Sequence, residues 1–241
     1  MLDPVLDLLL GGTCVGCGEP GRSLCAACVA LLPGTAWPAW PSPSPPGLAP
    51  PWSTAPYDGV VRSALLAHKE RHVAGLAVHL AGMLAAAAAA AAPGPRLLVP
   101  VPSRPGAARA RGHEPLLDVC RRAARLLPDT RVACLLRSRG GVSDQAGLTS
   151  VERAANLAGS LWCPSAALRR HAGRPGHVVL CDDVLTTGST VREGQRALAA
   201  AGVAVTGIAT VAATQRRTGT GRIPTHRELS GPRLPWGEDV D

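Results

Sequence analysis

The chain has 241 residues, a formal net charge of +8 and 46% hydrophobic residues, which suits one α/β domain with a small appendage and excludes global disorder. Aromatic residues make up only 2% of it, which argues against a base-stacking platform for single-stranded nucleic acid. Lys69 is the only lysine, so a Schiff base or a P-loop would have to use it. No apolar stretch predicts a membrane span, because the Ala-rich run at 85–92 is only weakly hydrophobic.

The N-terminus differs from a secretory signal, because it carries Asp3 and Asp7 in place of basic residues and its apolar part is short. We expect a short amphipathic helix that leads into Cys14, and a cytoplasmic location. Cysteines in that compartment are usually thiols or metal ligands.

Residues 1–32 contain two C-x₂-C pairs separated by seven residues, formed by Cys14, Cys17, Cys25 and Cys28. Two such pairs can surround one zinc ion tetrahedrally, and four thiolates leave no open coordination position. The pattern therefore predicts a structural zinc module, with a redox pair or a vestigial site as the alternatives. The other four cysteines are expected in the core, where free cysteine is common: Cys120, Cys134, Cys163 and Cys181.

Residues 33–56 contain nine prolines and are interpreted as a linker or an irregular wrap. Helical spacing of apolar residues then runs from Tyr57 to Ala92. Beyond it, strands and helices alternate, which predicts a parallel α/β sheet. The strands are expected at 96–102, 132–136, 177–181 and 203–211, and the helices at 114–127, 150–158 and 189–201. Residues 137–147 are expected to be a loop, and residues 214–241 a disordered tail.

The most informative segment follows the apolar strand at 177–181. Two acids, Asp182 and Asp183, come first, and a turn of small and hydroxyl residues then leads into a helix: Thr186, Thr187, Gly188, Ser189 and Thr190. A helix N-terminus with hydroxyl donors binds phosphate, and the acids suit ribose hydroxyls and a divalent cation. Ligands of open α/β sheets bind at the carboxyl ends of strands. The segment therefore predicts a sugar-phosphate site.

Two other phosphate-related sites are excluded by the lysine count. A P-loop needs Gly-Lys-Ser/Thr, and the turn has no lysine. A phosphoacceptor receiver domain also places paired acids at a strand end, but it needs a lysine on a late strand, and none follows Lys69.

The acid and threonine segment resembles the 5-phosphoribosyl-1-pyrophosphate (PRPP) signature of type I phosphoribosyltransferases. The resemblance implies that fold, a mostly parallel sheet flanked by helices, over residues 57–213. It also implies that Asp182 and Asp183 contact the ribose hydroxyls and that Thr186 to Thr190 bind the 5′-phosphate.

The rest of the chain is similar to the ComF branch, which is associated with competence. The resemblance rests on the cysteine quartet and on Tyr57-Asp58-Gly59 with Lys69. It also rests on three later groups, Val99 to Arg104, Arg109 to Gly112 and Gln145 to Leu157. It implies Mg²⁺ as a partner of PRPP and a closing loop at 137–147. It further implies that Ser103, Arg104, Arg109 and Arg111 face the pyrophosphate, although His113-Glu114 departs from the family's pattern.

Two functions remain open at this point. One is a PRPP-binding phosphoribosyltransferase of unknown acceptor. The other is a non-enzymatic adaptor in DNA uptake that docks a helicase-like ATPase through its zinc module, with weak single-stranded DNA contact. The charge distribution favours a polyphosphate ligand, because residues 96–153 alone carry a net charge of +6, on the segment expected to face pyrophosphate.

Overall fold

The structure is a computed structural model that describes residues 12–103, 114–139, 157–171 and 176–214. Its main sheet has six strands in the order β1-β2-β8-β7-β3-β4. All neighbours in it are parallel except β1, which pairs antiparallel with β2 at the edge. The strands are β1 (Trp37–Pro38), β2 (Pro51–Pro56), β3 (Arg96–Pro100), β4 (Thr130–Val132), β7 (His177–Leu185) and β8 (Gly207–Ala213).

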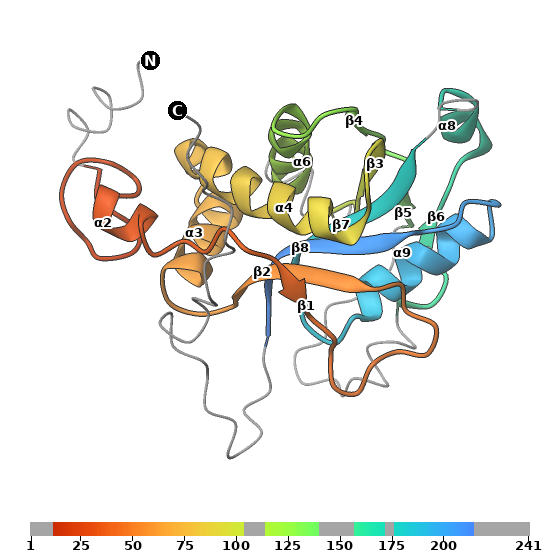
Figure 1. The fold of residues 1–241 in the computed structure, drawn as a ribbon, viewed down its shortest axis with the longest axis horizontal. Coiled ribbons are helices and arrows are strands. Elements are labelled where there is room, and N and C mark those ends of the chain that lie inside the picture. The colour runs from red at the N-terminus through yellow and green to blue at the C-terminus, as the bar shows by residue number, and fades with distance from the viewer. Residues whose placement is uncertain (1–11, 104–113, 140–156, 172–175, 215–241) are drawn as a thin grey trace, which may run out of the picture.

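Helices cover both faces of this sheet, as Figure 1 shows. One face holds α3 (Gly59–Glu70), α4 (Ala77–Ala91) and α6 (Pro115–Arg125), and the other holds α9 (Ser189–Ala199). The remaining described elements are short: α2 (Ala26–Val29), the 3₁₀ turn η1 (Ala74–Leu76), α8 (Ser165–Arg169), and a separate two-stranded sheet of β5 (Arg137–Ser138) and β6 (Leu161–Trp162). The predicted fold class is confirmed.

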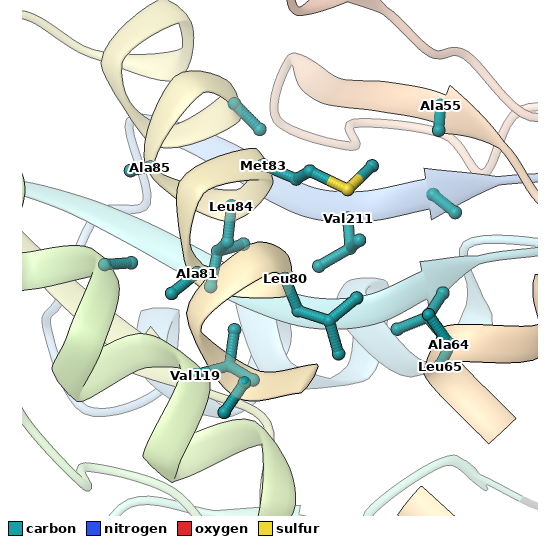
Figure 2. Packing of buried hydrophobic residues seen from close by; sticks show 14 of the residues in the cluster. Ala55, Ala64, Leu65, Leu80, Ala81, Met83, Leu84, Ala85, Val119 and Val211 are labelled. Carbon is teal, nitrogen blue, oxygen red and sulfur yellow. The ribbon is translucent and has the colours of Figure 1, made fainter. Parts of the chain in front are cut away.

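The core divides into two clusters because successive side chains of a strand point to opposite faces of the sheet. On β7, Val179 and Cys181 contact the α3–α4–α6 layer, whereas Leu180 contacts the α9 layer. Figure 2 shows the first layer, in which Leu80 and Leu84 of α4 lie near Val211 of β8 and Val119 of α6. The alanines of α4 keep this helix close to the sheet, since they add little bulk between the leucines.

The stretch Ala74–Ala91 has a mean hydropathy of 1.8 and, among the described residues, is long and apolar enough by composition to cross a membrane. Half of it is buried within the protein. Its leucines Leu76, Leu80 and Leu84 are fully buried against other elements, so their apolar character already has a role in the core.

The expectation of a linker at 33–56 is wrong for its last residues. Residues 51–56 form β2, which is parallel to β8 and mostly buried, and β1 adds an edge strand. Proline is tolerated there because Pro51 and Pro56 stand at the two ends of the strand. The segment is short and rich in proline and small residues, so its sequence lacks a strand pattern. It becomes a strand only because it pairs with β8.

Other boundaries also differ from the expected ones. The long helical region is broken at residues 71–73, where His72 has a positive φ of 58°. β4 covers only 130–132, because the chain turns after Ala133. There the amide of Leu135 donates to the carbonyl of Ala133 instead of to the neighbouring strand. The expected loop at 137–147 begins instead with β5, and residues 140–147 lie outside the described residues. Three other expected segments also lie outside them: most of the helix at 150–158, the helix before Cys14 and the tail from 215.

Candidate functional site

The connections between strands run in opposite directions along the sheet on the two sides of β3 and β7. The chain passes from β3 through α6 to β4 on one side, and from β7 through α9 to β8 on the other. Such a switch point opens a crevice beyond the carboxyl ends of the two strands, and this is where ligands of open α/β sheets bind. Here β3 ends at Pro100, whereas β7 continues to Leu185 along β8 alone. The two acids are therefore part of the strand, which extends four residues past its expected end.

A cavity of about 510 Å³ lies at this switch point. Asp182 and Asp183 line it together with Ser103 from the segment after β3 and Thr186 and Thr190 from the turn before α9. Leu65, Leu80 and Val119 contribute apolar walls from the helices above the sheet. Residues expected at the two ends of a phosphoribosyl ligand thus share one cavity.

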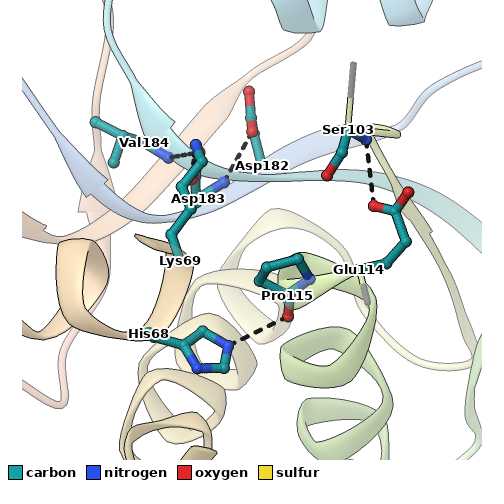
Figure 3. A network of polar contacts seen from close by, with 8 residues as sticks. All are labelled: His68, Lys69, Ser103, Glu114, Pro115, Asp182, Asp183 and Val184. Atoms are coloured by element: carbon teal, nitrogen blue, oxygen red, sulfur yellow. Dashed lines mark hydrogen bonds and ion pairs between the residues drawn. The ribbon is translucent and has the colours of Figure 1, made fainter. Parts of the chain in front are cut away.

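The acid pair has a defined set of hydrogen bonds. Asp182 Oδ1 accepts the amide of Asp183 at 2.9 Å, and Asp183 Oδ1 accepts the amide of Val184 at 2.9 Å. Asp183 Oδ2 lies 2.6 Å from Lys69 Nζ, as Figure 3 shows. The sequence drew attention to Lys69 as the only lysine, but its contact with Asp183 was not predicted, because 114 residues separate the two.

The two carboxyl groups titrate differently. Burial raises the pKa of Asp182 well above its ordinary value, and the charge of Asp183 adds to the effect. Burial acts in the same direction on Asp183, but the Lys69 ammonium outweighs it and holds the pKa of Asp183 below its ordinary value. Paired acids with opposite shifts of pKa are typical of functional sites.

The turn before α9 places its hydroxyl groups in two directions. Thr186 and Thr190 line the cavity, whereas the hydroxyl groups of Thr187 and Ser189 lie 2.9 Å apart and hydrogen-bond to each other. Gly188 has a left-handed φ of 76°, which favours glycine. A Cβ at this position would lie 3.2 Å from Pro41 and 3.3 Å from Pro45, so the turn also needs glycine for space.

The Pro-rich segment supports α9 from the side. The Gln195 side chain donates to Gly47 O at 2.8 Å and accepts the amide of Ala49 at 2.9 Å, and Arg192 donates to Pro46 O at 3.0 Å. The segment expected to be a linker or wrap therefore holds the helix that carries the threonine turn.

The segment expected to face pyrophosphate is described only in part. The amide of Ser103 donates to Glu114 Oε2 at 3.3 Å, so a carboxylate from the start of α6 accepts from this loop. Arg104, Arg109 and Arg111 lie outside the described residues.

The four N-terminal cysteines meet in one cluster, with all four sulfur atoms within 4.8 Å of one another. Tetrahedral zinc with Zn–S bonds of about 2.3 Å places sulfur atoms about 3.8 Å apart, and Cys17 Sγ and Cys25 Sγ are separated by 3.6 Å. The amide of Cys25 donates to Cys14 Sγ at 3.3 Å, as thiolate ligands commonly require. The donor set therefore fits one zinc ion.

The thiols of this cluster have unequal acidity. Burial acts to raise the pKa of Cys14, but hydrogen bonds from backbone amides, that of Cys25 first, lower it to about 6. Burial and the neighbouring thiols raise the pKa of Cys28 to about 12. Zinc binding would release these protons, because only thiolates coordinate the ion.

The cysteine cluster also contacts the larger domain. Cys14, Leu24 and Cys28 belong to the same buried cluster as Val61 and Leu65 of α3. A Cβ on Gly16 would lie 2.7 Å from Cys28 Sγ and 3.2 Å from Val60 of α3, so glycine is needed for this close approach. Of the remaining cysteines, Cys120 and Cys181 are buried as expected, whereas Cys134 is exposed and Cys163 half-buried.

Residues 137–226 match the family model described as the phosphoribosyl transferase domain. The matched range contains β7, the acid pair, the threonine turn, α9 and β8. No curated protein matches the chain. The match and the sheet together define a phosphoribosyltransferase domain, with a mostly parallel sheet between helices and an N-terminal cysteine cluster positioned for zinc. They support a place among proteins similar to type I phosphoribosyltransferases.

Proposed function

We propose that the protein is a ComF-type phosphoribosyltransferase that binds PRPP in the cavity between β3 and β7. One observation carries the proposal: the acid pair, the ends of the threonine turn and Ser103 line a single cavity at the switch point of the sheet. The cavity of about 510 Å³ lies within the range of small-molecule sites in proteins.

Each part of the ligand has candidate partners. Asp182 and Asp183 would accept hydrogen bonds from the ribose hydroxyls, and Thr186 to Thr190, at the N-terminus of α9, would donate to the 5′-phosphate. Ser103, with Arg104, Arg109 and Arg111, would bind the pyrophosphate, since arginine matches phosphate oxygens bidentately. Mg²⁺ would be held at the acid pair with the pyrophosphate and would neutralise charge there.

In the transfer step, the bond from ribose C1 to pyrophosphate breaks, and pyrophosphate leaves with the electron pair. A nucleophile of the acceptor, not yet identified, then forms the new bond to C1. Positive charge develops on the ribose ring in the transition state. The ionised Asp183 carboxylate would lie close to the ribose, where it would orient the sugar and stabilise that charge.

The primary test is calorimetric titration of the full chain with PRPP and Mg²⁺. Wild type should bind, and Asp182→Asn and Asp183→Asn should each weaken binding by roughly 10- to 100-fold, because a hydrogen bond to a charged group contributes about 1.5–3 kcal/mol. Asp118→Asn is the matched control, since Asp118 pairs with Arg122 on the exposed face of α6 and, among the described residues, does not line the cavity. Absence of binding by wild type would refute the proposal.

Activity requires a second measurement, which is release of pyrophosphate in the presence of a panel of nucleobases and amines. Release that depends on one acceptor, and that is lost in Asp183→Asn, would identify the enzyme as a transferase. PRPP binding without release across the panel would favour the second candidate function.

That second function is a cytoplasmic adaptor of DNA uptake, in which PRPP acts as a signal. One observation favours it: Leu31, which follows α2 of the zinc module, is 68% exposed and could contact a helicase-like ATPase. Leu31→Glu should then abolish capture of that purified ATPase without changing PRPP affinity. Weak contact with single-stranded DNA is tested separately by fluorescence anisotropy, where binding should fall steeply with added salt.

A further inference from the structure

Lys69 is the only lysine of a chain whose other 24 Lys and Arg residues are all arginine. Its Nζ lies 2.6 Å from Asp183 Oδ2, across 114 residues of sequence. Figure 3 shows its side chain reaching from the end of α3 toward the end of β7. An ammonium is a compact point charge with three donors, whereas a guanidinium is a broad planar fork, so the two are not interchangeable in a confined site.

The fold fixes the direction of this side chain. His68, its neighbour, is 6% exposed, and its two ring nitrogens lie 3.4 Å from Val73 O and 3.4 Å from Pro115 O. These contacts tie the last turn of α3 to the start of α6 and set the rotation of the helix. Lys69, one residue further along, consequently faces the carboxyl end of β7.

Lys69 also lines the cavity that the acids line. Its side chain is 44% exposed and that of Asp183 is 25% exposed, so a ligand in the cavity reaches both groups. One carboxylate oxygen of Asp183 accepts a hydrogen bond from Lys69 Nζ, and the other accepts one from the amide of Val184. Its carboxylate is thus held in one orientation, with a positive charge beside it, before any ligand or metal ion arrives.

An acid pair that binds ribose hydroxyls brings negative charge close to the phosphates of the same ligand and repels them unless a cation neutralises it. Within the described residues, the Lys69 ammonium lies where such a cation is needed, directly on one acid of the pair. Building on the proposed function, we propose that Lys69 is a positioning residue of the phosphoribosyl site: its ammonium orients Asp183 and takes over part of the charge neutralisation for which the acids would otherwise need a divalent cation.

The test compares PRPP affinity of wild type, Lys69→Met and Lys69→Arg with and without Mg²⁺. Mg²⁺ is removed with a chelating resin from the buffer and ligand only, because a soluble chelator could also strip zinc from the cysteine cluster. Wild type should bind in Mg²⁺-free buffer. In the same Mg²⁺-free buffer, Lys69→Met should bind PRPP about tenfold or more weakly than wild type, and much of this lost affinity should return when Mg²⁺ is added.

Lys69→Arg separates charge from shape. Because it keeps the charge, it should depend on Mg²⁺ as wild type does, while its bulkier head weakens binding by about the same factor in both buffers. Arg71→Met, which removes an exposed cation one residue beyond α3, is the matched control and should bind as wild type does. Zinc content and thermal melting verify that each variant is folded.

A second measurement is independent of ligand binding. In a carboxyl ¹³C NMR titration, the Asp183 signal should titrate at a higher pH in Lys69→Met than in wild type. An unchanged Asp183 titration, or equal dependence on Mg²⁺ in wild type and Lys69→Met, would overturn the role of Lys69 while leaving PRPP binding intact. Wild type that binds no PRPP in either buffer would instead refute the proposed function.

Discussion

Short sequence motifs indicate both the cysteine cluster and the acid site, yet the residues of the first are close in the chain and those of the second are far apart. The four cysteines lie within 15 residues, and a local fold brings their sulfur atoms together. The acid site draws on residues from Tyr57 to Val211, and Lys69, which contacts Asp183, comes from 114 residues away. A metal site can therefore be identified from spacing alone, whereas a ligand site assembled by a sheet can be identified only in part.

The largest expected effect comes from the cluster. Cys28→Ser should reduce bound zinc from one ion per chain to none, because three thiolates and a hydroxyl form a much weaker set, and structural zinc contributes about 10 kcal/mol or more to the folding of such modules. Elemental analysis measures the zinc, and limited proteolysis should show cleavage within residues 12–32.

Cys28→Ser also tests whether the cysteine cluster and the acid site are structurally coupled. Since Cys28 shares a buried cluster with Val61 and Leu65 of α3, the loss of zinc should loosen α3 and weaken PRPP binding by a few-fold. Cys134→Ser is the control, because Cys134 is exposed and outside the cluster. A folded wild-type protein that contains no metal would contradict the assignment of zinc.

A smaller effect is expected at the turn before α9. Gly188→Ala combines an unfavourable left-handed φ with contacts at 3.2 Å and 3.3 Å to Pro41 and Pro45, and should cost about 1–2 kcal/mol in the free energy of unfolding. Urea denaturation measures it. Gly202→Ala has a similar φ of 77° but nothing near its Cβ, so it should cost less; equal costs would mean that the prolines do not support the turn.

The acid pair gives a prediction about the pH dependence of stability. Because the pKa of Asp182 is raised in the folded protein, the folded state binds more protons than the unfolded state above the ordinary Asp pKa, and stability falls as pH rises through the folded pKa. Asp182→Asn does not titrate and can still accept the amide of Asp183. Its stability relative to wild type should therefore increase as the pH rises from below the ordinary Asp pKa toward the raised pKa of Asp182.

The control for this experiment is Asp183→Asn, which should behave in the opposite way. The pKa of Asp183 is lowered, so its contribution to stability is present above the ordinary Asp pKa and is lost as pH falls through the folded pKa. Thermal melts over the pH series measure both variants. A parallel pH dependence in the two would contradict opposite shifts of pKa.

The smallest effect is expected from the contact between the Pro-rich segment and α9. Gln195→Ala removes hydrogen bonds to Gly47 and Ala49 and should lower stability by about 1 kcal/mol, because each net contribution is small and water replaces part of it. PRPP affinity should fall about twofold if the segment positions the threonine turn. Arg121→Ala, at an exposed position of α6, should change neither.

The sequence by itself determined the local features. Apolar runs and helical spacing predicted β3, β7, α6 and α9 to within a few residues, and the paired cysteines predicted a cluster positioned for zinc, since in each case the residues that decide the structure are close in the chain. The acids and the hydroxyl turn likewise indicated a site at the end of β7, because a strand followed by a helix N-terminus is itself a local pattern.

Only the tertiary structure decided which distant segments complete the site. Pro51–Pro56 becomes a strand because β8 offers it a parallel partner, not because its residues prefer that state. Pro41 and Pro45 support Gly188, and Lys69 meets Asp183, because the order of the strands and the packing of α3 bring them together. Such contacts depend on where helices and strands cross, and pattern and propensity along the chain carry no information about that geometry.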